Sequence, residues 1–275
     1  MISDTNWDVK SMEENRNEII LKAIGKPAYS NCFLAFGIVQ EKINQGKMFV
    51  FCETDIVVLL EKKDGCYQFY YFLSQKEIPG TSWVNLKMQL EEYGPLKLEL
   101  ISKSDKAVYN TVVSNLNFSL YKTYLRKSFF CGNIIKPYRE MLDTDTAKPE
   151  DVNYIYDMLM DTFDLISDYI FDKGELMDLI LKGNILKIVL AGEIAGVLIF
   201  EDTKYTSYAK VLCINEKYRN NVIGYALFAK YINMHLSFIK LFYLWVDKDN
   251  HDVLGLHNKF GYKEDRLKDY IFVRR

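Results

Sequence analysis

The segment from Asn215 to Ile232, NEKYRNNVIGYALFAKYI, combines residue types that could hold a phosphate group. It follows SYAKVLCI, a run typical of a strand, and continues with the apolar spacing of a helix. The backbone N–H groups in the first turn of a helix lack intrahelical partners and lie at the positive end of the helix dipole. Together with Lys217 and Arg219, these groups predict a pyrophosphate site.

The turn before this helix contains one glycine, Gly224, and a valine, Val222, where a second glycine would give the backbone more freedom. A β-branched residue at positive φ is strained by about 1–3 kcal/mol, so we expect Val222 to be right-handed helical or extended. Asn220 and Asn221 tolerate left-handed geometry better. Because a valine removes no backbone donor, we expect the turn to bind phosphate, and Gly224 would allow close approach of a ligand or of the neighbouring strand.

A sheet and further helices must position this turn, and the surrounding pattern supplies them. After Pro149 the sequence predicts helices over residues 151–161, 174–181, 222–235 and 250–259, and strands at ILKIVLA, EIAGVLIFED, SYAKVLCI, IKLFYLWV and RLKDYIFVR. In the last of these helices Val253, Leu256 and Phe260 form an apolar stripe that includes His257. We therefore expect His257 to point inward, towards the sheet.

The first half of the chain has a similar order of elements. A helix over residues 31–45 precedes the strand-like runs KMFVFC, DIVVLLEK and CYQFYYFL, then the helix WVNLKMQLEEYG, the strand LKLELI, a helix from Ser104 and the strand FSLYKTYLRKSFF. Pro137 and Pro149 interrupt the pattern, so we predict domains at residues 1–132 and 133–275. Each would be an α+β domain with a mixed, mostly antiparallel sheet flanked by helices. Internal duplication explains the similarity, and a chance likeness between two α+β domains is the alternative.

Two phrases of the second half resemble the GNAT family of acetyl-CoA-dependent N-acetyltransferases. The first is LCINEKYRNNVIGYAL, with Arg219 and Gly224 at the family's phosphate-binding positions. The second is the helix headed by Asn250 that ends in LHNKFGY, with Gly261 and Tyr262 in place. Their order and separation also fit, and the resemblance covers residues 149–275. It implies two GNAT-like domains, with no CoA site in the first, because SQKEIPGTSW there lacks the glycine pattern and Pro79 has no N–H.

The resemblance also implies a site and its residues. The residues expected to bind acetyl-CoA are Leu212, Cys213, Ile214, Arg219, Asn220, Asn221, Val222, Ile223, Gly224, Tyr225 and Asn250. His257 stands where the family usually has a tyrosine, so one interpretation makes it the general acid at the departing sulfur. The other makes it a packed core residue.

Several residues keep a structural alternative. Asn250 could contact the pantetheine arm, cap its helix, or do both. Arg219 could contact a phosphate or be solvated. The acids Asp157, Asp161, Asp164 and Asp168 could attract a cationic amine, but their spacing also fits the solvated face of a helix, which we favour. Glu201 or Asp202 could be a general base, and a water chain could replace either.

Composition narrows the classes of function. The chain has 275 residues, 49% of them apolar, and a formal net charge of −2, which argues against a nucleic-acid binder. Its five cysteines are never spaced as C-x-x-C, so we expect reduced thiols and a cytoplasmic location. The three histidines form no metal-ligand pattern, and the polar N-terminus is not that of a signal peptide. No apolar run is long enough to span a membrane.

The resemblance and these limits favour one function over two alternatives. We expect an acyltransferase that moves an acetyl or short acyl group from acetyl-CoA to a primary amine by direct attack. The first alternative is a non-catalytic module that binds CoA or a partner, which Val222 and His257 favour. The second is an aminoacyl transfer from charged tRNA, which the net charge disfavours. The acceptor amine and the oligomeric state are left open.

Overall fold

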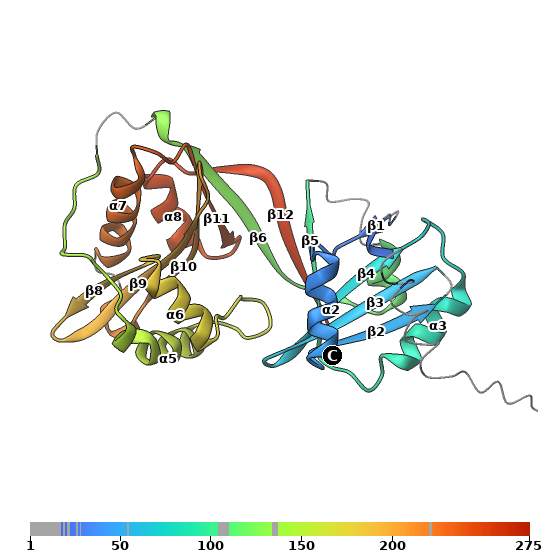
Figure 1. Ribbon diagram of the computed structural model, residues 1–275. Helices are drawn as coiled ribbons and strands as arrows, with labels where there is room; N and C mark the ends of the chain where they lie inside the picture. Colours follow the sequence, from blue (N-terminus) through green and yellow to red (C-terminus); the bar gives the residue numbers. More distant parts are fainter. Residues whose placement is uncertain are drawn as a thin grey trace, which may run out of the picture. The chain divides into compact units, whose positions relative to one another are not determined.

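The computed structural model describes residues 18, 20, 23–25, 27, 29–53, 55–103, 110–133, 137–219 and 222–275. The chain forms two compact units (Figure 1). Unit 1 consists of Met1–Tyr121 together with Tyr270–Arg275, and unit 2 consists of Lys122–Asp269. Ser104, the expected start of a helix, lies outside the described residues.

Unit 1 is built on a meander of three antiparallel strands that is extended by a parallel one. Its elements are β1 (Tyr29–Ser30), α2 (Phe36–Asn44), β2 (Met48–Glu53), β3 (Ile56–Lys63), β4 (Cys66–Leu73), α3 (Gly80–Gln89), β5 (Leu96–Ser102) and α4 (Asn110–Asn115). β2, β3 and β4 pair antiparallel, and β5 joins β4 in parallel. Trp83 and Leu86 of α3 pack on this sheet in a core that also takes up Tyr270 and Phe272 from the C-terminal end of the chain.

Unit 2 repeats this order of elements. Its elements are β7 (Asp145–Thr146), α5 (Val152–Thr162), α6 (Lys173–Leu181), β8 (Ile185–Leu190), β9 (Glu193–Asp202), β10 (Thr206–Ile214), α7 (Ile223–His235), β11 (Leu241–Asp247) and α8 (His251–Lys259). β6 (Ser119–Phe130) and β12 (Lys263–Arg274) have residues in both units. β8, β9 and β10 form an antiparallel meander, and β11 joins β10 in parallel. β6 begins in unit 1 and pairs antiparallel with β11 from Tyr124 onward.

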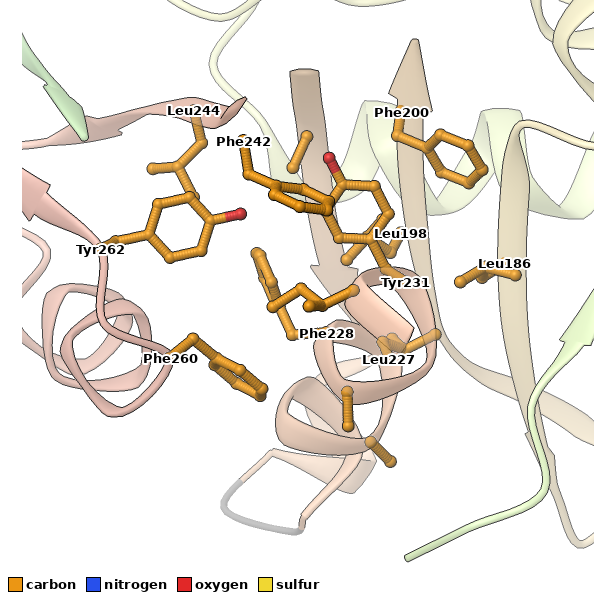
Figure 2. Packing of buried hydrophobic residues seen from close by; sticks show 14 of the residues in the cluster. Leu186, Leu198, Phe200, Leu227, Phe228, Tyr231, Phe242, Leu244, Phe260 and Tyr262 are labelled. Carbon is orange, nitrogen blue, oxygen red and sulfur yellow. The ribbon is translucent and has the colours of Figure 1, made fainter. Parts of the chain in front are cut away.

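Helices cover both faces of the unit 2 sheet. α7 lies on one face, where Leu227, Phe228 and Tyr231 pack against Phe242 and Leu244 of β11 (Figure 2). α5 and α6 cover the other face of β8, β9 and the end of β10. Each of these helices therefore buries its apolar stripe of side chains against the sheet, as its sequence pattern indicates.

The predicted α+β fold class is confirmed, and most predicted elements differ from the observed ones only at their ends. The helix predicted over residues 31–45 begins only at Phe36, and the chain before it contains the short strand β1, which the sequence did not predict. The units also divide at Tyr121 and not at residue 132, and residues 270–275 fold with unit 1. Pro137 and Pro149 mark the connection that follows β6, whereas the units divide within that strand.

Candidate active site

The two parallel strands of unit 2 separate part of the way along their length. β10 and β11 pair over Thr206–Ala209 and Leu241–Leu244, but β10 continues to Ile214 and β11 to Asp247. A β-bulge interrupts the pairing of β10 with β9 between Ala209 and Val211, where the separation begins. Bulges bend a strand and increase its twist. The space between the separated ends is called here the unit 2 wedge.

The chain leaves the unit 2 wedge through a short turn and enters α7. The helix's own bonding starts where Ala226 donates its N–H to the carbonyl of Val222 at 2.9 Å. The N–H groups of Ile223, Gly224 and Tyr225 precede that bond, so they are the donors that a helix leaves for another partner. Val222 is 42% exposed and avoids positive φ, as expected, but its φ of −73° and ψ of 9° are neither right-handed helical nor extended.

Two glycines allow the start of α7 to lie close against the sheet. A Cβ on Gly196 of β9 would be 2.8 Å from Cγ2 of Ile223, which is too close for real atoms. A Cβ on Gly224 would be 3.2 Å from both Ile214 and Leu256. Gly224 therefore permits close approach of the neighbouring strand and of α8, the second of the two purposes that the sequence left open.

The basic residues of the turn are paired with acids. Lys217 Nζ lies 2.9 Å from Glu193, and the half-exposed Arg219 lies 3.5 Å from Glu216. Asn220 and Asn221 lie outside the described residues. Because exposed ion pairs of this kind contribute little and break readily, both cations remain accessible to an anionic ligand.

The β10 residues expected at the site divide between the two faces of the sheet. Leu212 and Ile214 pack with the α7 core, whereas Cys213 is buried on the face covered by α5. The Cys213 thiol lies 3.4 Å from Thr162 Oγ1, and burial raises the pKa of Cys213 to about 11. A thiol that stays protonated is a poor nucleophile, so Cys213 is a core residue.

His257 points inward, as predicted from its place on the apolar stripe of α8. It is 3% exposed, and its ring packs between Phe228 and Tyr262, at centroid distances of 5.2 and 5.7 Å. Burial, followed by the positive charge of Lys127, lowers the pKa of His257 to about 3. The neutral ring is a weak proton donor near neutral pH, which favours the packing interpretation over the general acid.

Two buried polar atoms near this ring have no hydrogen-bond partner in the described part of the chain. They are His257 Nδ1 and the hydroxyl of Tyr262.

Asn250, at the other end of α8, acts as its N-cap, because its Oδ1 accepts the N–H of Val253 at 3.2 Å. The helix-capping alternative for Asn250 is therefore observed, and a contact with a ligand stays a prediction.

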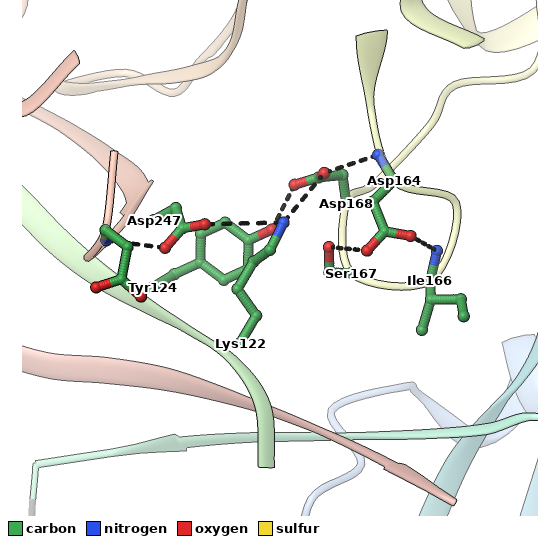
Figure 3. A network of polar contacts seen from close by, with 8 residues as sticks. Lys122, Tyr124, Asp164, Ile166, Ser167, Asp168 and Asp247 are labelled. Carbon is green, nitrogen blue, oxygen red and sulfur yellow. Dashed lines mark hydrogen bonds and ion pairs between the residues drawn. The ribbon is translucent and has the colours of Figure 1, made fainter. Parts of the chain in front are cut away.

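The opposite face of the sheet carries a polar network that the sequence reading missed (Figure 3). Tyr124 of β6 donates to Asp168, and Lys122 lies 3.7 Å from Asp168 and 3.8 Å from Asp247. Burial, followed by the charge of Asp168, raises the pKa of Tyr124 above its usual value. Asp164 stabilises the connection between α5 and α6, which also contains Asp168, because it accepts a hydrogen bond from the Ser167 hydroxyl at 2.9 Å.

The expectation of a solvated helical face was thus wrong for Asp164 and Asp168. α5 ends at Thr162, so both acids lie in the connection to α6 and not on a helix. Asp157 and Asp161 are on the helix and exposed, as expected. Asp164 and Asp168 instead bond to backbone N–H groups and side chains nearby, and bonds of that kind compete with helix formation.

Aromatic rings extend this face alongside the bulge. Tyr208 of β10 stacks on Tyr243 of β11 at 4.8 Å. Lys210, at the bulge, lies between 5.2 and 5.9 Å from the rings of Tyr169, Phe171 and Tyr208 and bonds to Glu201 at 2.9 Å. The sequence does carry a pattern that could have predicted this polar face. Aromatic or charged residues alternate with apolar ones along β6, β10 and β11.

The two possible bases are both paired. Glu201 bonds to Lys210 on the polar face, whereas Asp202 bonds to the buried His235 of α7 at 2.8 Å. Glu201 therefore lies with the polar network, and Asp202 is tied to the helix on the other face.

Among the described residues no group of three or more His, Cys, Asp or Glu side chains could hold a metal ion, and no helix is long and apolar enough to cross a membrane.

No protein-family model and no curated protein sequence matches this chain. Several solved structures match it in fold. A probable N-acyltransferase from Enterococcus faecalis is 12% identical, with a TM-score of 0.60 over 96% of this chain and 70% of its own. A GCN5-related N-acetyltransferase from Sphaerobacter thermophilus is 12% identical, with a TM-score of 0.56 over 85% and 84%.

A tandem GNAT protein from the clavulanic acid biosynthesis pathway also matches. It is 10% identical, with a TM-score of 0.54 over 80% of this chain and 78% of its own. At such identities the likeness concerns the fold and not the reaction. The chain has the fold of the GNAT N-acetyltransferases.

Proposed function

We propose that this protein is an acyltransferase that moves an acetyl or short acyl group from acetyl-CoA to a primary amine. The separation of β10 and β11 beside the start of α7 is the observation that carries the proposal. An extended donor can lie along the exposed edge of β10 and direct its phosphates at the N–H groups of Ile223, Gly224 and Tyr225. Arg219 and Lys217 would add charge to that contact.

The reaction needs no covalent enzyme intermediate. The neutral amine attacks the thioester carbonyl, a C–N bond forms, the C–S bond breaks, and CoA leaves as a thiolate that takes up a proton. A backbone N–H of β10 near Cys213 and Ile214 would polarise the carbonyl. The protonated thiol of Cys213 fits this direct route, because the route uses no nucleophile from the protein.

The acceptor would bind on the polar face. Tyr208, Tyr243 and Lys210 lie at the bulge where the strands separate, and Glu201 is the possible base on that side. Glu201 could take the proton of the attacking amine if Lys210 moved away or if a water molecule relayed the proton. His257 remains a proposed acid, although its burial makes water the simpler proton source for the thiolate.

A non-catalytic module that binds CoA or a partner protein is the second candidate. The burial of His257 favours it, because burial removes a group that catalysis would use. In either case we propose that only the second half binds the donor, that the protein is cytoplasmic, and that it binds no nucleic acid.

Calorimetry of the full chain with acetyl-CoA, followed by an assay of thiol release with a panel of amines, tests the proposal. We expect saturable binding and release that depends on one class of amine. Binding without release for every amine would favour the non-catalytic module. Absence of binding would overturn the acyltransferase and a CoA-binding module, and would leave a module that binds a partner protein. Strongly salt-dependent RNA binding would support transfer from tRNA.

A further inference from the structure

Unit 1 contains a second wedge at the corresponding place in its own sheet. β4 and β5 pair in parallel only over Tyr67–Phe69 and Leu96–Leu98. β4 then continues to Leu73 and β5 to Ser102. As in unit 2, the strands that separate are the third strand of the meander and the parallel strand that follows the next helix. This space is called here the unit 1 wedge.

The chain's own residues occupy the unit 1 wedge. Tyr29 and Ser30 of β1 pair antiparallel with Leu73 and Phe72, on the separated part of β4. Asn31 follows them at the point where the strands separate. Its Nδ2 donates to the carbonyls of Phe69 at 2.9 Å and Glu99 at 3.2 Å, so it reaches both strands.

A third hydrogen bond gives the oxygen of the Asn31 carboxamide a partner as well. The N–H of Tyr71 donates to Asn31 Oδ1 at 2.7 Å. Two donors and one acceptor of the side chain thus meet two carbonyls and one N–H of the backbone, and Asn31 is only 7% exposed. This is what the amides of an inserted peptide-like ligand would offer to the same strand edges.

We propose that the unit 1 wedge is an amide-binding slot, filled from within by the carboxamide of Asn31. Without that side chain, Phe69, Tyr71 and Glu99 would present buried polar groups that need a partner, and a small amide from solution would supply it. The inference does not depend on the proposed function. If that function also holds, the filled slot explains why one chain binds one acyl donor, in unit 2.

Chemical rescue of the full chain tests the slot. Asn31→Gly removes the carboxamide and leaves a space that matches acetamide, which has the same functional group as the side chain. We expect Asn31→Gly to lower Tm and acetamide to restore it in a saturable way, with no saturable effect on the unaltered protein. Asn115→Gly is the matched control, because the carboxamide of Asn115 is exposed and bonds to Thr111 within its own helix.

Asn31→Asp separates recognition of an amide from filling of space. The aspartate has nearly the same shape, but it places an oxygen against the carbonyls of Phe69 and Glu99. We expect it to lower Tm as well and to resist acetamide, because the space stays filled. Equal effects of acetamide on all variants, or no rescue of Asn31→Gly, would overturn the proposal.

Hydrogen exchange of the unaltered protein provides a test that needs no variant. The N–H of Tyr71 should exchange as slowly as the strand-paired amides of β4, because Asn31 holds it. Rapid exchange at Tyr71, with slow exchange at its neighbours, would show that the carboxamide does not fill the slot and would contradict the proposal even if Asn31→Gly failed to fold.

Discussion

At the residue scale, burial determines what His257 can contribute. Its pKa is about 3 in the folded protein, whereas an exposed histidine in the unfolded chain has a pKa of about 6.5. Between these values the unfolded state binds a proton that the folded state does not. The free energy of unfolding should therefore fall by about 1.4 kcal/mol for each pH unit below about 6.5, until the pH approaches 3.

His257→Phe should remove this part of the pH dependence, since phenylalanine does not titrate. Denaturant unfolding at a series of pH values measures the slope. His251→Phe is the matched control, because His251 lies exposed on the same helix. An identical slope for His257→Phe and the unaltered protein would show that the ring is not buried as a neutral group.

The same variant distinguishes the two interpretations of His257 in catalysis. Loss of a general acid would lower kcat by roughly 10²–10⁴ and leave acetyl-CoA affinity unchanged. We expect kcat and its pH profile to change little, because a ring with a pKa of about 3 is not matched to acid catalysis near neutral pH. Steady-state kinetics with the best amine acceptor decides, and a large fall in kcat would restore the acid role.

Arg219 allows a second test at this scale. Arg219→Ala should weaken acetyl-CoA binding about tenfold to a hundredfold, as loss of a charge-assisted hydrogen bond would. Val222→Gly should preserve or tighten binding, because glycine adopts the negative φ of Val222 and adds backbone freedom beside the phosphates. Calorimetry measures both. Arg266→Ala, an exposed arginine of β12, is the control, and equal affinity in all variants would place the phosphates elsewhere.

At the element scale, the position of α7 depends on the absence of a side chain at Gly196. A Cβ there would meet Cγ2 of Ile223 at 2.8 Å and the carbonyl of Cys213 at 3.2 Å, so the helix must move away from β9. We expect Gly196→Ala to cost about 1–3 kcal/mol of stability, as overpacking does, and to weaken acetyl-CoA binding because the donors at the start of α7 shift.

Gly255→Ala provides the contrasting control. Gly255 lies in α8, and a Cβ added there would meet no neighbouring atom within 4 Å. Alanine at this position should therefore be neutral or stabilise the protein by about 0.4–1 kcal/mol. Thermal unfolding and calorimetry compare the two variants. Equal stability and equal affinity for Gly196→Ala and Gly255→Ala would contradict the close contact between α7 and β9.

At the scale of the whole molecule, the strands β6 and β12 each contribute residues to both units. Residues of β6 from Tyr124 on pair with β11 in unit 2, whereas Tyr270 and Phe272 from the end of β12 lie in the core of unit 1. Each half of the sequence therefore completes its fold with a strand from the other half. The two units share an order of elements, and internal duplication stays a prediction.

This sharing of strands predicts how fragments behave. A fragment of residues 133–275, the domain that the sequence predicts, lacks β6 and leaves the edge of β11 and the space of Phe129 unfilled, so we expect it not to fold. A fragment of residues 122–275 keeps β6 and should fold and bind acetyl-CoA. Circular dichroism and calorimetry compare them, and a folded 133–275 fragment that binds the donor would refute the argument.

The sequence by itself determined the fold class, most of the order of elements and the negative φ of Val222. Those features follow from local causes, namely apolar periodicity and the steric cost of positive φ in a β-branched residue. It also indicated that His257 points inward, because that depends only on the stripe of its own helix.

Only the tertiary structure decided which distant residues meet. The polar network of Tyr124, Lys122, Asp168 and Asp247 joins three segments that are separate along the chain, and β12 begins in unit 2 and ends in unit 1. Asn31 gives no sign in the sequence that it fills a wedge between β4 and β5. Such contacts depend on how strands separate and exchange, because side-chain pairing across a sheet is set by register and not by local propensity.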